Sequence, residues 1–434
     1  MKAFIRSMAL LTLTALLAVS LCAPVLAEET GNVDFAGQIA FDMQSETVKQ
    51  QVTVKNYVDG DTTHFFVPKA IAADGVLKAR YLAVNTPEST GKIEEWGKAA
   101  ARFTREKLEN AEEIWIESDD TAWNLDSTGA RDLVWVWYRP KGEQDFRNLN
   151  IELLQNGLAI ANSSAQNRYG DTCMAAIAQA RAQKRNIYSG EKDPDFFYGD
   201  AIELTIKELR LHPEAYDGKK VAFTGVITVN HNNSVFIEDY DGETGLYFGF
   251  SAYYGNNMSG GGLEVLTVGN EVRIVGTVQY YEAGHTWQVS GLTYRMMKPK
   301  DPGNIQIISQ GHSPAWTEIT PEQFYSTVTI ETESGPETCE FAYLAQGTSV
   351  LVRGVYAGLS KEYGSGSVCS LISPELNEDG VHDVLWIWID ADILRSLDLK
   401  ENSVYDVRGI VDCDAQNDYR ISVYTKDGIT TRDN

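Results

Sequence analysis

Cysteine and histidine are scarce in this chain, and their spacing argues against a zinc site. Among 434 residues there are five cysteines and six histidines, none at the short mutual spacing that zinc ligands show. Four cysteines follow the first 27 residues, at positions 173, 339, 369 and 413. The last three allow one disulfide in an exported protein, but the sequence does not decide which pair would form it.

Long apolar runs are absent after the first 27 residues. Near the start, two basic residues precede an apolar stretch (8–21), and Val25-Leu26-Ala27 has the pattern of a cleavage site, with the cut predicted after Ala27. About fourteen apolar residues are too few for a membrane anchor. Leu21 is bulky immediately before Cys22, where a lipoprotein signal needs a small residue. We therefore expect a signal peptide over residues 1–27 and a secreted protein, extracellular or periplasmic, with no membrane span.

Positive charge is also scarce. The chain has 37 Lys and Arg against 61 Asp and Glu, a net charge of −24, or −26 without the first 27 residues. The deficit is uneven, with a net charge of −5 over 45–200 and −17 over 201–434. The second part would repel a polyanion, whereas the first would tolerate one. Chemistry on a polyanionic substrate therefore belongs in the first half.

The length of 434 residues and the hydrophobic content of 43% predict two to four domains and exclude a disordered chain. A polar, proline-bearing segment at 191–195 reads as a linker, and residues 28–47 read as an extended lead-in. The predicted domains are 48–192, 200–300 and 312–430.

The first domain has the pattern of an α+β unit. Apolar alternation predicts strands near 51–58, 62–68, 76–84, 113–118 and 132–138. Helical periodicity and capping residues predict helices over 97–110, 148–156 and 171–185. Five strands and three helices in this order predict a five-stranded barrel of the OB type with helices packed against it.

The remaining chain repeats one plan. Residues 218–226 resemble 347–355, and 269–278 resemble 401–411, which indicates an internal duplication. Strands with a glycine at a bend suit small barrels, so we expect a mainly β protein with two further OB-like domains. A pair of β-sandwiches is the alternative. The run Ser259–Gly262 reads as a flexible surface loop.

Polar side chains gather at the ends of two strands predicted in the first domain. Asp61 follows an Asp-Gly turn and would begin a strand with its carboxylate free. The strand that contains Arg80 ends at a Thr-Pro pair, because proline interrupts pairing. Binding of a hard cation beside phosphate chemistry needs such a set. Its members are Asp61, Arg80, Asn85 and Glu88.

Five pieces of the first domain resemble, in the right order, staphylococcal-nuclease-like proteins (thermonucleases), over about residues 48–190. The pieces are Asp59-Gly60-Asp61-Thr62 with Arg80 and Asn85-Thr86-Pro87-Glu88; Glu95 to Ala100; Asp126 to Leu133; Leu149 to Ala159; and Asn186-Ile187-Tyr188. The resemblance implies the same OB-type barrel. It also implies a calcium-dependent nuclease that hydrolyses phosphodiester bonds of DNA and RNA with little sequence preference and leaves 3′-phosphate ends.

The resemblance implies a calcium site in this chain. Asp61, Asn85 and the carbonyl of Thr86 would ligate the ion, which takes oxygen ligands. The family usually has Asp where this chain has Asn85. The neutral amide would weaken binding by about 1–3 kcal/mol.

The resemblance also implies the residues that act on the phosphate. Arg80 and Arg131 would hold it through their planar, bidentate guanidinium groups. Glu88 would orient or deprotonate the attacking water. Ala130 adds one residue before Arg131, and the tyrosines of the family's nucleotide pocket are not evident in this chain.

Two functions therefore stand side by side. The first is an exported nuclease, favoured by Arg80, Glu88 and Arg131. The second is a non-catalytic binding or scaffold protein whose acidic C-terminal domains bind a surface or protein partner; Asn85 and Ala130 favour it.

Overall fold

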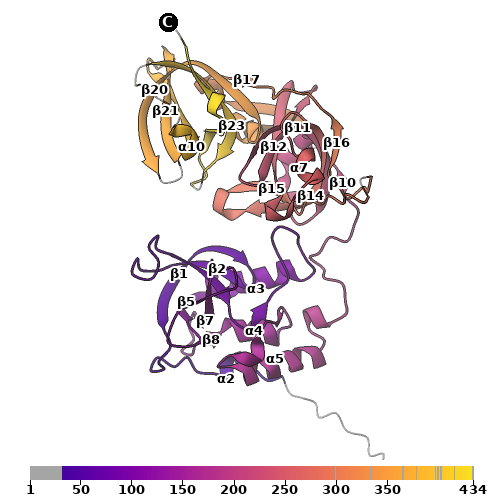
Figure 1. The fold of residues 1–434 in the computed structure, drawn as a ribbon, viewed down its shortest axis with the longest axis vertical. Helices are drawn as coiled ribbons and strands as arrows, with labels where there is room; N and C mark the ends of the chain where they lie inside the picture. Colours follow the sequence, from indigo (N-terminus) through magenta and orange to yellow (C-terminus); the bar gives the residue numbers. More distant parts are fainter. Residues whose placement is uncertain are drawn as a thin grey trace, which may run out of the picture.

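The computed structural model describes residues 32–298, 300–332, 335–363, 366–377, 379–395, 397, 400, 403–414 and 416–432. The predicted signal peptide, 1–27, lies outside the described residues. The chain is mainly β and forms three successive β-rich units, as predicted. In Figure 1 the first unit, indigo to magenta, lies below the other two, which contact each other. Their sheets span 49–148, 202–309 and 317–431; the predicted domain limits stay predictions.

The first unit is a closed barrel. Its five main strands pair in the order β3-β2-β1-β5-β7, and the parallel pairing of β3 with β7 closes the circuit. These strands are β1 (Lys49–Asp59), β2 (Thr62–Phe66), β3 (Val76–Tyr81), β5 (Ala111–Glu117) and β7 (Asp132–Pro140). The helices are α3 (Gly97–Glu109), α4 (Leu149–Gln155) and α5 (Gly170–Ala182). The predicted OB-type barrel with three helices is confirmed.

Short strands and turns complete this unit. The strands are β4 (Val84–Asn85), β6 (Asn124–Leu125), β8 (Arg147–Asn148) and β9 (Ile160–Ala161). Trp135 and Trp137 on β7 are fully buried, and both meet the ring of Tyr169 edge-on. This aromatic packing joins β7 to the start of α5.

The lead-in predicted as extended is partly helical. Asp34 caps α2 (Phe35–Gln38) and also binds Arg147 through two hydrogen bonds of 2.8 and 2.9 Å. Phe41 then packs against Trp137, with ring centroids 5.2 Å apart. The lead-in therefore belongs to the first core, because its apolar side chains find buried aromatic partners there.

The linker at 191–195 also packs rather than running free. Asp193 is buried and accepts a hydrogen bond of 2.6 Å from the backbone of Trp96, next to α3. Arg102 pairs with Asp195 at 2.7 Å. The linker is therefore held against the helix of the first unit.

The second and third units share one topology. Their sheets follow the orders β10-β11-β12-β13-β15-β14-β16 and β17-β20-β21-β22-β24-β23-β25, and the pairings β11–β14 and β20–β23 close a five-stranded circuit in each. The same strand order in both sheets is expected of an internal duplication. The closed circuits show that the sandwich alternative was wrong.

The elements of the second unit begin with a short parallel strand and a capped helix. They are β10 (Ile202–Glu203), α6 (Ile206–Leu211), β11 (Lys220–His231), β12 (Ser234–Asp241), β13 (Leu246–Tyr253), α7 (Gly261–Val265), β14 (Glu271–Tyr281), β15 (Thr286–Ser290) and β16 (Gln306–Ser309). The glycine run predicted as a flexible loop instead starts α7, and Gly262 is buried against Met258 and Tyr294. Glycine fits there because a larger side chain would meet those neighbours.

The third unit adds an insertion to the same plan. Its elements are β17 (Thr317–Glu318), α8 (Pro321–Phe324), β18 (Thr327–Thr332), β19 (Gly335–Glu340), α9 (Phe341–Ala345), β20 (Ser349–Tyr363), β21 (Gly366–Leu376), β22 (His382–Asp390), α10 (Ala391–Leu394), β23 (Val404–Cys413), β24 (Tyr419–Val423) and β25 (Ile429–Thr431). The disulfide that the sequence allowed is not formed, because Cys339, Cys369 and Cys413 are all free thiols.

The second and third units form a joint interface. Arg210 is fully buried and donates to the carbonyls of Gly249 at 2.7 Å and of Gln346 at 3.0 Å. Glu238, also buried, accepts from the backbone and hydroxyl of Ser349 at 2.7 and 2.9 Å. Buried charges with satisfied hydrogen bonds define one docking geometry for the two units.

Candidate active site

Asp61 lies at the start of β2, where a tight turn joins it to β1. Its side chain is fully buried and accepts a hydrogen bond of 2.8 Å from the backbone of Thr86 and one of 3.0 Å from the hydroxyl of Thr62. The turn needs Gly60, because a Cβ there would lie 2.8 Å from the Cβ of Ala100 and 2.9 Å from Cγ2 of Thr86. The glycine lets the turn press against α3 and so places the Asp61 carboxylate inside the molecule.

Arg80 bridges Asp61 and Asn85. It stands on β3 opposite Thr62, and its guanidinium forms an ion pair with Oδ1 of Asp61 through Nη1. Its Nη2 donates to Oδ1 of Asn85 at 2.5 Å. Its side chain is 13% exposed and that of Asp61 is 0% exposed. Two predicted ligand oxygens therefore face a single positive group, in surroundings where water screens the charge little.

Thr86 completes the set of oxygens. It is buried, and its Oγ1 has no hydrogen-bond partner among the described residues. Its neighbour Asn85 is held in place by the backbone pairing of β4 with β9. A carboxylate, an amide oxygen and a backbone carbonyl are ligands of the type that calcium takes. The residues present therefore fit a hard cation in kind, although Arg80 lies on two of the oxygens that such a cation would use.

The described residues hold no group of three or more His, Cys, Asp or Glu side chains that could bind a metal. A site here would rely on one buried carboxylate together with neutral oxygens. Fewer anionic ligands mean weaker binding of a divalent cation.

Asp59, which the sequence pattern predicts only as a turn residue, adds a second buried carboxyl group. Its Oδ1 accepts from the hydroxyl of Ser89 at 2.7 Å and from the backbone of Gly60 at 2.8 Å. Burial raises the pKa of Asp59; the hydrogen bond from Ser89 opposes this, and the charges of Asp61 and Glu88 add to it. Its position two residues before Asp61 in the Asp-Gly-Asp sequence was the signal that could have identified it.

Glu88 lies on a loop that runs from the end of β4 to the start of α3. Its side chain is exposed. The loop closes on itself, since the backbone of Glu94 donates to the carbonyl of Glu88 at 2.9 Å. Gly97 opens α3 directly against that carbonyl, and a Cβ at this glycine would lie 2.1 Å from the oxygen. The loop thus presents a solvent-accessible carboxylate close to the buried Asp59.

The second unit holds the same loop from outside. Gly91 and Gln279 exchange hydrogen bonds of 3.1 and 3.2 Å, and the hydroxyl of Ser290 donates to the carbonyl of Gly91 at 2.9 Å. Nearby, Lys98 pairs with Asp217 at 2.5 Å, and Arg105 forms an ion pair with Glu282. The loop that carries Glu88 is therefore shared between the first two units.

Arg131 is not drawn into the Arg80 cluster. It lies just before β7, two residues from Leu133, which pairs with Arg80. Asp126 holds it through contacts of 2.7 Å from Nε and Nη2. Although burial opposes the shift, hydrogen bonds from Thr128 and Arg131 lower the pKa of Asp126 to about 2. Arg131 would have to leave this carboxylate in order to hold a phosphate.

The barrel, the Asp61–Arg80–Asn85 cluster and the three helices all lie between residues 49 and 182. Residues 78–190 match the family of staphylococcal nuclease homologues. This nuclease homologue domain begins, in the match, just before Arg80 and ends just after the last predicted helix. The matched range contains Asn85, Glu88 and Arg131 but not Asp61, which the structure joins to it through Arg80.

Members of this family typically hydrolyse nucleic acids, so the nuclease homologue domain implies a nuclease-like or nucleic-acid-binding function. Within the part of the chain that the structure describes, no helix is both long and apolar enough to cross a bilayer.

Proposed function

We propose that this protein is an exported, calcium-dependent nuclease that hydrolyses phosphodiester bonds of DNA and RNA with little sequence preference. The observation that carries the proposal is the convergence of Asp61 and Asn85 on one positive group, the guanidinium of Arg80. The exposed carboxylate of Glu88 lies on the adjoining loop. This arrangement supports a site where a cation, a phosphate and a water molecule meet.

In this proposal, Asp61, Asn85 and the carbonyl of Thr86 hold calcium. The bound ion would neutralise phosphate charge and so stabilise the transition state of phosphodiester hydrolysis. Arg80, once released from Asp61 and Asn85, has two parallel donors for the phosphate oxygens.

Glu88 orients or deprotonates the attacking water, since its exposed carboxylate can reach solvent and substrate. Arg131 supplies a second guanidinium for the phosphate when it exchanges Asp126 for the substrate.

Export is the remaining part of the proposal. Its support is the sequence of residues 1–27, with basic residues, an apolar stretch and small residues before the predicted cleavage. Millimolar calcium outside cells would suit a site with few anionic ligands, since extracellular calcium modules bind with dissociation constants of roughly 0.1–1 mM.

One observation favours a second function. Arg80 is tied to two acceptors, Arg131 is tied to Asp126, and Asn85 brings no charge. A barrel held in this way would serve a non-catalytic binding or scaffold protein, and the acidic C-terminal units would bind a surface or protein partner.

The decisive experiment measures nicking and degradation of plasmid DNA by the purified chain without residues 1–27, first with calcium and then with a chelator. Arg80→Ala and Asn85→Asp are assayed beside it, and Arg139→Ala serves as control, because Arg139 pairs with Glu112 and Glu113 away from this cluster. Calcium-dependent degradation that Arg80→Ala abolishes and Arg139→Ala retains supports the nuclease. If the native protein does not degrade DNA but Asn85→Asp does, the metal site is weakened by one missing negative charge. If neither the native protein nor any variant degrades DNA, the result favours the binding or scaffold function.

A further inference from the structure

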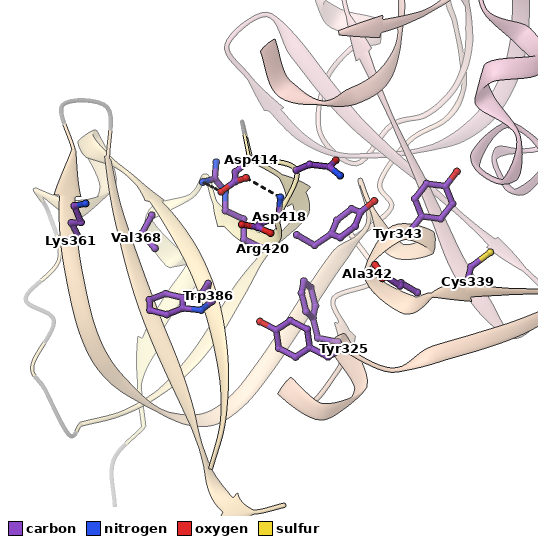
Figure 2. A pocket seen from close by; sticks show the side chains of 14 residues that line it. Tyr325, Cys339, Ala342, Tyr343, Lys361, Val368, Trp386, Asp414, Asp418 and Arg420 are labelled. Carbon is purple, nitrogen blue, oxygen red and sulfur yellow. Dashed lines mark hydrogen bonds and ion pairs between the residues drawn. The ribbon is translucent and has the colours of Figure 1, made fainter. Parts of the chain in front are cut away.

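A cavity of about 1330 Å³ opens in the third unit, away from the elements that carry the nuclease side chains. It is larger than the roughly 300–1,000 Å³ of most small-molecule pockets, so it suits an oligomeric ligand. Figure 2 shows Val368 and Trp386 on the barrel side, Ala342 and Tyr343 on the opposite side, and Arg420 with Asp418 between them.

The insertion of the third unit builds one wall of this cavity. In the second unit, α6 ends at residue 211 and β11 begins at 220, whereas in the third α8 ends at 324 and β20 begins only at 349. The added segment carries β18, β19 and α9, and its Ala342 and Tyr343 line the cavity. The duplicated barrels thus differ at the place where the cavity lies.

The wall is firmly supported from behind. Ile330 and Leu344 of the insertion are buried in the hydrophobic core of the second unit, and the hydroxyl of Tyr343 donates to the carbonyl of Arg210 at 2.9 Å. The other wall consists of β20, β21 and β22 with the connection between β23 and β24. This is the face and loop region that OB folds use for oligonucleotides and oligosaccharides.

Exposed aromatic rings line the cavity. Trp386 on β22 is 45% exposed and Tyr325, just after α8, is 55% exposed, although both are large apolar side chains. The guanidinium of Arg420 lies 4.8 Å from the ring centroid of Trp388, on the neighbouring part of β22. Flat aromatic faces at a cavity wall are suited to stacking against a flat ligand.

Nucleic acid strands and oligosaccharides both stack on aromatic side chains, and the charge of the cavity decides between these two ligand classes. The cavity is lined by the carboxylates of Glu340, Asp414 and Asp418 against the cations Lys361 and Arg420, and the chain from 201 onward has a net charge of −17. A nucleic acid strand needs a positive groove, which this is not. A neutral ligand meets no such repulsion.

The polar groups fit a ligand rich in hydroxyl groups. Nε of Arg420 is buried and has no hydrogen-bond partner among the described residues, and its Nη1 reaches Asp414 only at 3.9 Å. Asp418 also lines the cavity and is exposed. Hydroxyl groups can donate to carboxylates and accept from a guanidinium at the same time.

We propose that this cavity binds a neutral oligosaccharide, whose ring faces stack on Trp386 and Tyr325 and whose hydroxyl groups bind Asp418 and Arg420. The site would attach the protein to a glycan while the first unit acts elsewhere. The proposal does not depend on nuclease activity.

The test is a calorimetric binding titration of the full chain without residues 1–27. The sugars titrated are cellotetraose, maltotetraose, xylotetraose and chitotetraose, and oligodeoxythymidylate represents the competing ligand class. Trp386→Ala should weaken binding of the bound sugar by about tenfold or more, as loss of a central aromatic anchor does. Asp418→Ala, an exposed position that should not disturb folding, should weaken it several-fold. Tyr240→Ala, an equally exposed aromatic on the second unit, is the control and should change nothing.

Saturable sugar binding that follows this pattern supports the proposal. Three results overturn it: no binding of any of these sugars, sugar binding that survives both Trp386→Ala and Asp418→Ala, or oligodeoxythymidylate binding that Trp386→Ala abolishes. Calcium-dependent DNA degradation, measured in parallel, reports on the nuclease proposal separately.

Discussion

Gly91 and Gln279 exchange two hydrogen bonds across 188 residues of sequence: the Gly91 amide donates to Oε1 at 3.1 Å, and Nε2 donates to the Gly91 carbonyl at 3.2 Å. Gly91 lies on the loop of Glu88, and Gln279 lies on β14 of the second unit. An OB-like unit with no nuclease motif of its own therefore helps to hold the loop that carries the proposed base. The position of a catalytic group affects rate steeply, so this contact has consequences that can be measured.

Gln279→Ala should lower the turnover of the proposed nuclease by about tenfold. The Glu88 loop would lose both hydrogen bonds to Gln279 and would sample positions from which the Glu88 carboxylate cannot reach the attacking water. Steady-state DNA degradation at saturating calcium measures the effect. Gln288→Ala is the control. Gln288 lies on β15 opposite Gln279 in the sheet, but the hydrogen bonds of Gly91 go to Gln279 and Ser290. Equal turnover in both variants would show that the second unit does not position the loop.

Asn85→Asp should tighten calcium binding by about tenfold, which corresponds to about 1.4 kcal/mol, because it adds a second carboxylate where Arg80 and Asp61 already meet. The calcium concentration at half-maximal activity, or calorimetry if the native protein is silent, gives the change. Asn124→Asp, at an exposed position on β6, controls for the added negative charge. An unchanged calcium dependence in Asn85→Asp would remove this residue from the metal site.

Gly60→Ala should lower the free energy of unfolding by about 1–3 kcal/mol, the usual cost of forcing extra volume into a packed interior. The new methyl group would meet Ala100 and Thr86 at 2.8 and 2.9 Å, and neither neighbour can swing aside. Urea denaturation measures the loss. Gly242→Ala, which points into open space, should be close to neutral; a similar loss in both would mean that the Gly60 turn is not tightly packed.

Stability should fall with rising pH because of Asp59. The pKa of this carboxyl is raised in the folded state, chiefly by burial, so its contribution to stability is complete below the unfolded pKa, near 4, and is lost as pH rises through the raised pKa. Asp59→Asn should remove that part of the pH dependence and be more stable than the native chain by about 1–2 kcal/mol at alkaline pH. Denaturation at a series of pH values measures this, with the exposed Asp145→Asn as control. Parallel pH profiles for the native chain and Asp59→Asn would contradict the burial effect.

The sequence by itself determined the strands of the barrels and the positions of Asp61 and Arg80 beside strand ends. Alternation of apolar residues and the Asp59-Gly60 turn are local, since pleating and turn geometry need only a few neighbouring residues, and they placed β1, β2 and β3 within a few residues of their observed limits. The same local spacing placed Asp61 beside a turn at the start of one strand and Arg80 near the end of another. The repeated glycine-bearing strands likewise predicted that the second and third units share one plan.

Only the tertiary structure decided which side chains meet. Arg80 meets Asp61 across 19 residues and Gln279 binds Gly91 across 188, so both contacts come from packing between separate segments of the chain. The contacts of Arg80 with Asn85 and of Arg131 with Asp126 span only five residues each, but they depend on how the folded backbone aims the two side chains. The lead-in around Phe41 and the glycines that open α7 were misread for the same reason, since their partners, Trp137 and Tyr294, are distant in sequence. Local pattern sets the conformation of a strand or turn, whereas the partner of a side chain depends on how whole units pack.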